Sequence, residues 1–149
     1  MKKIILPIML TFFSSQLLAN TAYIPEVTKS MVGAYSSRTC FSTTNISDVD
    51  VNVNFTFFDL NGVLYTSPIE GAVNISAIGQ PTVLQPNQTA SFCLPNNAPT
   101  YYGHGKIDVF AVDGISRSVL AVAHAKIGTY NSGLPTSALE VTINGGMPF

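Results

Sequence analysis

The chain has 149 residues and little charge: seven Lys and Arg against eight Asp and Glu give a formal net charge of −1. Charged residues make up 10% of the chain and hydrophobic residues 46%, whereas soluble domains are typically about a quarter charged. The chain is too apolar for a disordered protein and too short for more than one ordinary domain. It also lacks the basic excess with which nucleic-acid-binding proteins neutralise phosphates.

The first 19 residues have the layout of a bacterial secretory signal peptide. Lys2 and Lys3 form the basic start, residues 4–13 the apolar segment, and Ala19 ends a cleavage site, with Ala22 as the alternative. The apolar segment falls short of the ~20 residues that span a bilayer. We therefore expect an exported protein, periplasmic, at the cell surface or extracellular, with no membrane insertion after cleavage. Its five cations and eight acids would give a net charge of −3.

After the leader, we expect a loosely held segment followed by a folded domain. Residues 20–30 are expected to form a loosely held N-terminal arm, and residues 31–149 a single domain that opens with a strand over residues 35–44. Residues 49–57 alternate apolar and polar types without an error, which predicts a strand with one buried and one wet face. The Asn-Gly pair that follows is a strong hairpin signal, so residues 63–66 are predicted to form the return strand.

Short apolar segments separated by Gly, Pro and Asn continue to the C-terminus, and no long segment shows helical periodicity. About eight strands with such turns predict an all-β fold, a single antiparallel, immunoglobulin-like β-sandwich. The remaining predicted strands cover residues 72–77, 89–94, 106–112, 118–127 and 139–143.

Two cysteines in an exported chain predict one disulfide, Cys40–Cys93. Phe41 and Phe92 stand beside them with opposite parity. Because a strand alternates its faces, both sulfurs are expected on the polar face or near a sheet edge. This arrangement differs from the disulfide of immunoglobulin domains, which crosses the core between the sheets.

The residue types give little support to catalysis or metal binding. The only histidines are His104 and His124, and the serine segment over residues 114–118 lacks the Gly-x-Ser-x-Gly frame of a nucleophile elbow. The acids are scattered along the chain. Asp48 and Asp50 could supply oxygens to Ca²⁺, but Asp50 belongs to the polar stripe of its strand. We predict no catalytic residue, no metal site and no cofactor, and hence not an enzyme.

Tyr101, Tyr102 and His104 lie in a glycine-flanked segment and form the candidate recognition tip. The alternative is that the tyrosine pair packs over one end of the sandwich. As a recognition tip they would contact a protein or glycan partner at the cell surface.

A series of short motifs runs along the chain. Asp59-x-x-Gly62 follows the alternating strand, Leu84-x-Pro86 and Gly105-x-Ile107 come later, and the chain closes on Ile-Asn-Gly-Gly-Met-Pro-Phe over residues 143–149. In this order they resemble a family of small exported bacterial immunoglobulin-like β-sandwich proteins of unknown function with an Ile-Asn-x-Gly-x-Pro-Phe tail. The resemblance implies the fold and export, and it brings no activity or site residues.

Three functions are compatible with these features. The expected one is a non-enzymatic exported module that binds or scaffolds an unknown ligand in the periplasm or at the cell surface. The alternative is a pilus or fimbrial subunit that assembles by strand addition, although residues 145–148 break the terminal strand such subunits need. The third is a small outer-membrane β-barrel, suggested by apolar residues of one parity from Leu139 to Phe149.

Overall fold

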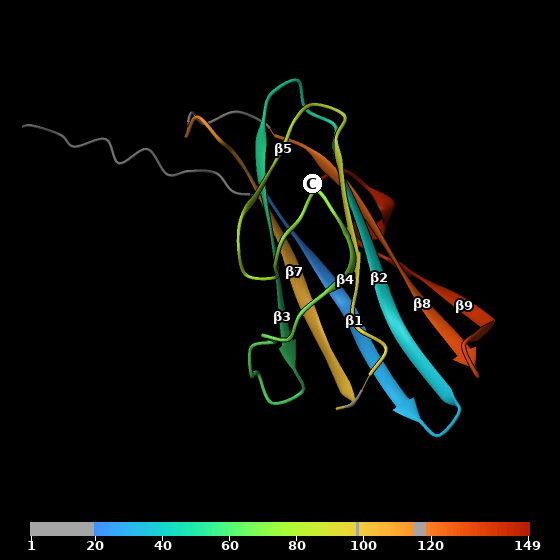
Figure 1. Cartoon of the computed structure of the whole chain (residues 1–149). Coiled ribbons are helices and arrows are strands. Elements are labelled where there is room, and N and C mark those ends of the chain that lie inside the picture. The colour runs from blue at the N-terminus through green and yellow to red at the C-terminus, as the bar shows by residue number, and fades with distance from the viewer. Residues whose placement is uncertain (1–19, 98, 115–118) are drawn as a thin grey trace, which may run out of the picture.

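The computed structural model describes residues 20–97, 99–114 and 119–149. The predicted leader and Ser118, the first residue of a predicted strand, lie outside them. The described part holds nine strands and one short 3-10 helix, which confirms the all-β class (Figure 1). The elements are β1 (Asn20–Val32), β2 (Tyr35–Asn45), β3 (Val51–Asp59), β4 (Glu70–Val73), β5 (Thr82–Leu84), β6 (Thr89–Cys93), β7 (Tyr101–Ala111), β8 (Ala121–Asn131), β9 (Leu134–Thr142) and η1 (Asn144–Gly146).

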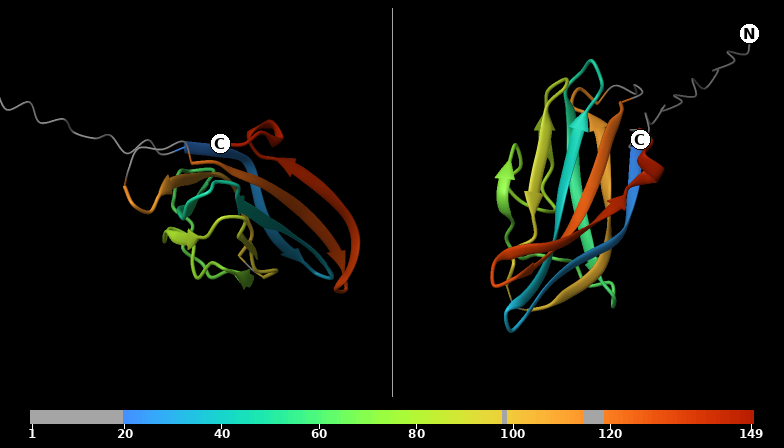
Figure 2. Two further views of the ribbon diagram at one scale, coloured as in Figure 1. Left: turned by 90° about the horizontal axis from the view of Figure 1, so that it is seen from above. Right: turned by 90° about the vertical axis from the view of Figure 1, so that its right-hand side faces the viewer.

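Every strand pair is antiparallel. The order runs β4–β6–β2–β1–β7–β3–β5, and β8 pairs with both β2 and β9. The strands form two layers, as Figure 2 shows. One layer holds β4, β6, β2, β8 and β9, and the other holds β7, β3, β5 and the first part of β1. Because the end of β1 pairs with β2, hydrogen bonding continues from one layer into the other.

Four phenylalanines from the two layers form the centre of the core. Phe41 on β2 and Phe92 on β6 face Phe55 and Phe57 on β3. The ring centroids of Phe41 and Phe57 are 4.9 Å apart, as are those of Phe55 and Phe92. Each aromatic pair adds about 0.5–1.5 kcal/mol beyond the burial of its area. The predicted alternation is confirmed, because buried and half-buried residues alternate along β3.

The turn after β3 forms as expected, but the predicted return strand over residues 63–66 is wrong. The Asp59 carboxylate accepts the backbone N–H groups of Asn61 and Val63, and Gly62 takes a positive φ of 79°. Beyond the turn only one bridge forms, between Phe58 and Leu64. The Tyr65 N–H still donates to the Phe57 carbonyl oxygen, but the Phe55 carbonyl oxygen accepts from Gly79 and β5 pairs with the rest of this edge, so the segment after Tyr65 does not continue the ladder.

The expected loose arm over residues 20–30 is also wrong, because this segment forms most of β1. Ala22, Ile24 and Val27 are buried there, and the strand pairs with β7 from Asn20 to Lys29. The pairing register shifts between Ile24 and Val27. This bulge interrupts the period-two pattern by which a strand is recognised in sequence.

The C-terminal tail folds back onto β8. Strand β9 ends at Thr142, and η1 follows with Gly145 and Gly146 at positive φ, so the expected break in the terminal strand is confirmed. Phe149 is buried and exchanges two backbone hydrogen bonds with Ala121. The alternate apolar residues from Leu139 to Phe149 therefore do not share one environment. Val141, Ile143 and Phe149 are buried, whereas Leu139 and Met147 are exposed.

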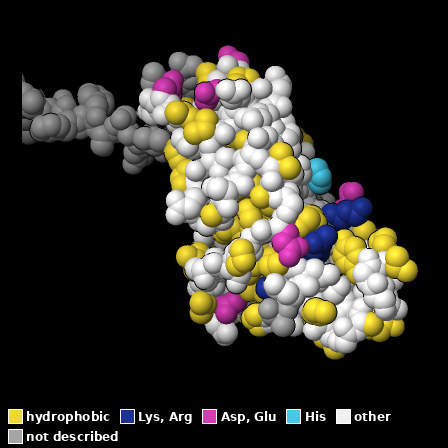
Figure 3. All heavy atoms as spheres, viewed as in Figure 1, with side chains coloured by type: hydrophobic (Ala, Val, Ile, Leu, Met, Phe, Trp, Pro, Cys, Tyr) yellow, Lys and Arg dark blue, Asp and Glu magenta, His cyan; other side chains and the backbone are white. Residues whose placement is uncertain are grey.

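The surface carries few charged side chains. On the face drawn in Figure 3, the few charged side chains lie in small groups, with acidic ones near the top and basic ones beside acidic ones at the right, and hydrophobic side chains are distributed over the rest among polar, uncharged atoms. Lys106 and Asp108 pair on β7 with 2.7 Å between Nζ and Oδ2. Asn, Ser and Thr recur on the outer faces of β2, β3 and β6, as the alternating sequence indicates, whereas β1 and β9 also expose large hydrophobic side chains such as Tyr23, Leu134 and Leu139.

Candidate binding site

The predicted tip residues lie at the start of β7, and alternation directs them to opposite sides of the strand. Tyr101 is half-buried, whereas Tyr102 is 52% exposed. His104 is exposed on the same side as Tyr102, with its ring stacked at 5.8 Å on Phe58. The three side chains therefore do not form a single tip.

Gly103 and Gly105, on either side of His104, allow the close packing of β7 against β3. A Cβ atom at Gly103 would lie 2.0 Å from the Phe58 carbonyl oxygen and 2.7 Å from the Tyr101 hydroxyl. At Gly105 it would lie 2.3 Å from the Phe57 ring. The spacing Tyr-Gly-His-Gly thus leaves room for the Tyr101 side chain and for the phenylalanine core.

Tyr101 borders a cavity at the end of the sandwich where β1 and β3 end and β7 begins, the lower end in Figure 1. Its ring meets the Tyr65 ring edge to face, with 4.8 Å between centroids. The cavity has a volume of about 150 Å³. Its polar lining includes Lys29, Asp59, Tyr65, Ser67, Thr100 and Tyr101.

Lys29 contributes a buried cation to this cavity. The residue is only 2% exposed, its Nζ donates a hydrogen bond of 3.0 Å to the Asn97 side-chain oxygen, and it lies 5.9 Å from the Tyr65 ring centroid. Burial lowers the pKa of the Lys29 ammonium, and the charge of Glu70 opposes that shift. Glu70 itself is paired with Arg38 at 3.0 Å. Within the described residues no carboxylate forms an ion pair with Lys29.

The hydroxyls of Tyr65 and Tyr101 are both buried and neither has a hydrogen-bond partner in the described structure. Tyr65 is 6% exposed. Burial raises the pKa of both hydroxyls. The charge of Asp59 adds to the rise at Tyr101, and the nearby Ser67 side chain partly offsets the rise at Tyr65. Both phenols stay protonated at neutral pH and are able to donate.

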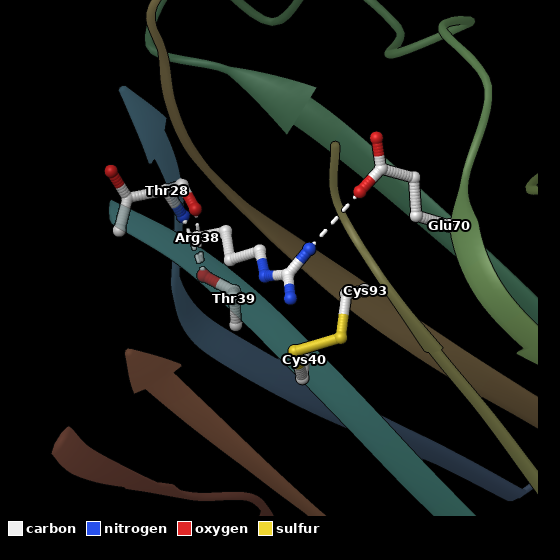
Figure 4. The surroundings of a disulfide bond; sticks show 6 residues. All are labelled: Thr28, Arg38, Thr39, Cys40, Glu70 and Cys93. Atoms are coloured by element: carbon white, nitrogen blue, oxygen red, sulfur yellow. Dashed lines mark hydrogen bonds and ion pairs between the residues drawn. A yellow bond between two sulfur atoms is a disulfide. The ribbon is translucent and has the colours of Figure 1, made fainter. Parts of the chain in front are cut away.

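The disulfide lies away from this cavity, on the outer face of its layer. Cys40 and Cys93 are directly opposed residues of β2 and β6, and both are partly exposed while Phe41 and Phe92 point inward. The predicted side of the sheet is therefore confirmed. Figure 4 shows the Arg38–Glu70 ion pair beside the disulfide, where it links β2 to β4.

The other candidate residues remain separate from one another. His124 is exposed on β8, and Asp48 and Asp50 are exposed before β3. Asn45 is buried and donates to the carbonyl oxygens of Val49 and Leu84, so it holds the chain in place before β3. Within the described ranges no group of three or more His, Cys, Asp and Glu side chains is arranged for a metal ion.

Sequence reasoning missed Lys29 and Tyr65. Lys29 fell in the segment expected to be an arm, and Tyr65 in the expected return strand. Alternation of Ala22 and Ile24 with exposed neighbours was a signal for β1, but the bulge removed it before Lys29. No local signal places Tyr65 against Tyr101, because that contact joins segments 36 residues apart.

No protein-family model, curated protein or solved structure matches the chain. Among the described residues, none of the helical structure has the length and apolarity needed to span a bilayer. The disulfide is typical of proteins that work outside the reducing cytoplasm.

Proposed function

We propose that the chain is a non-enzymatic, exported bacterial binding module of the immunoglobulin-like sandwich type, with its ligand site in the cavity beside Tyr101. One observation carries this proposal: Lys29, which is buried, and two tyrosines with buried hydroxyls line one cavity, and among the described residues neither hydroxyl has a partner at hydrogen-bond geometry. Burying polar groups without partners costs free energy, so folded proteins usually satisfy them. A bound ligand would supply the missing acceptors.

Export is supported by the leader pattern and by the disulfide. The pairing of β1 favours cleavage after Ala19 over cleavage after Ala22. Asn20, Thr21 and Ala22 are paired with β7, and Ala22 is buried, so the later cut would remove three residues that the sandwich uses.

Ligand screening by NMR tests the proposal. The full chain is expressed with its leader, the exported product is purified, and its N-terminus is determined; we expect Asn20. Backbone resonances are then followed during titration with oligosaccharides, short peptides, organic acids and amines. At least one class should shift the signals of Lys29, Tyr65 and Tyr101, and Tyr101→Phe should weaken binding while Tyr102→Phe does not. A panel that leaves these signals unmoved, or shifts only signals elsewhere, would overturn it.

Strand addition is a second candidate, favoured by the edge strand β9. Within the described residues β9 pairs with β8 alone, its side chains are exposed over seven successive residues, and Glu140 is its one charge. Natural edge strands usually carry charges that prevent such pairing. If β9 mediates assembly, light scattering should detect oligomers that Ala138→Lys abolishes and Gln80→Lys, in an exposed loop, preserves. A monomer at every concentration would contradict this function.

A further inference from the structure

Lys29 is a buried cation whose ammonium makes one side-chain hydrogen bond within the described residues. An ammonium has three N–H donors, and one of them binds the Asn97 side chain. The ion pairs in the described part of the chain join Arg38 to Glu70 and Lys106 to Asp108, and Lys29 belongs to neither. A buried charge without a counter-ion is costly, and an anion in the cavity would remove much of that cost.

The two phenols extend the same donor set. The Tyr65 ring is close to both other groups: its centroid is 5.9 Å from Lys29 Nζ and 4.8 Å from the centroid of the Tyr101 ring. Both hydroxyls are buried without an acceptor. Hydrogen bonds to an ionised acceptor are roughly twice as strong as bonds between neutral groups. The residues that line the cavity therefore carry one cation and two neutral donors, and a ligand rich in acceptors would reach the two hydroxyls once the tyrosine side chains shift, because both are closed to water here.

The surrounding charges select for a single negative charge. Asp59 lines the cavity and Glu70 acts on Lys29 electrostatically. These carboxylates disfavour a phosphate dianion, whereas a monoanion is balanced by the one ammonium. The volume of about 150 Å³ is sufficient for a small group, since a cavity of roughly that size holds a benzene molecule.

We propose that this cavity binds a carboxylate group, held by Lys29 Nζ and by the hydroxyls of Tyr65 and Tyr101. This inference rests on the proposed function and names the chemistry of its ligand. A planar carboxylate accepts up to about four hydrogen bonds, which is enough for this set of three donor groups. The carboxylate could come from the C-terminus of a peptide or from an acidic sugar, and both sources offer the same group to the cavity.

Titration of the purified exported protein with matched probes tests the inference. The probes are N-acetylglycine and its uncharged amide, methyl glucuronide and methyl glucoside, and inorganic phosphate. Binding is followed by NMR shifts and by tyrosine fluorescence, which is free of tryptophan emission because the chain has no Trp. Both carboxylates should shift the Lys29, Tyr65 and Tyr101 signals, their uncharged counterparts should not, and the tighter carboxylate identifies the source.

Variants separate the three donors. Lys29→Met should weaken carboxylate binding by about tenfold or more, and Tyr65→Phe and Tyr101→Phe by a smaller factor each, because hydrogen bonds to charged groups are the strong ones. Tyr102→Phe, next to the cavity residue but on the outer side of β7, should bind normally. Circular dichroism verifies that each variant folds. If Lys29→Met does not fold, the affinities of Tyr65→Phe and Tyr101→Phe for the carboxylate probes decide whether the inference holds.

Two outcomes overturn the inference and are distinguishable from failure of the proposed function. If an uncharged probe or phosphate shifts the cavity signals as strongly as a carboxylate, the cavity binds a ligand but the carboxylate assignment is wrong. If carboxylates bind with equal strength to wild type and all three cavity variants, they bind elsewhere. If no probe of the wider screen affects the cavity, the proposed function itself fails.

Discussion

Removing the disulfide should destabilise the protein strongly although both sulfurs lie outside the core. In Cys40→Ser/Cys93→Ser each serine would occupy a partly exposed position on the outer face, so little packing is lost. The main effect falls on the unfolded chain, which loses a cross-link between residues 53 apart. The chain-entropy relation gives about 4 kcal/mol for a loop of this length. For a domain of roughly 130 residues, this corresponds to a decrease in Tm of about 15 °C.

Thermal and urea unfolding, followed by circular dichroism under oxidising conditions, provide the measurement. Ser42→Ala/Ser91→Ala is the matched control, because these serines are also directly opposed on β2 and β6, one pair further along the same face. The control should retain wild-type stability, and reduced wild type should behave like the double serine variant. If the double serine variant unfolds at the same temperature as the oxidised wild type, the cross-link does not restrict the unfolded chain as argued.

Three further predictions concern the core, the cavity and β7. Phe92→Ala should lower the free energy of unfolding by about 3–5 kcal/mol in urea titrations, because it empties the centre of the aromatic core; a loss below about 1 kcal/mol would contradict that packing. Stability should fall as pH rises above the ordinary tyrosine value of 10.0, because Tyr65 and Tyr101 hold their protons in the folded state after the unfolded chain has lost them. In Tyr65→Phe/Tyr101→Phe this loss of stability should be smaller. The lowered pKa of Lys29 makes stability rise with pH up to 10.5, and this effect is common to both proteins. Parallel pH profiles of wild type and variant would contradict the assignment. Gly103→Ala should destabilise by about 1–3 kcal/mol in the same assay, since its methyl group would meet a backbone oxygen of β3 at 2.0 Å; an unchanged midpoint would refute the close contact.

The strands with regular alternation were predictable because their pattern is local. Along β3 every second side chain is apolar, and burial follows that pattern. The side of the sheet that carries the disulfide was predictable for the same reason, since Cys40 and Cys93 have the opposite parity to Phe41 and Phe92. In both cases neighbouring residues contain all the information needed.

The candidate site was predictable only in part. Tyr101 was identified from its glycine-flanked segment, but it was grouped with Tyr102 and His104, which lie on the other side of β7. Lys29 and Tyr65 were missed, because their roles arise from contacts between distant segments. A lysine in sequence is normally exposed, and only the packing around it indicates that it is buried.

By itself, the sequence determined the all-β class, the alternating strands, the turn at Asn61–Gly62 and the outward position of the disulfide. Tertiary structure alone decided that the segment before Gly33 is a paired strand, that the chain after the turn leaves the ladder, and that Lys29 meets Tyr65 and Tyr101 in one cavity. The reason is physical. Alternation and turn chemistry act over a few residues, whereas a bulge, an inward-turning tyrosine and a shared cavity depend on which surfaces the two layers bring together.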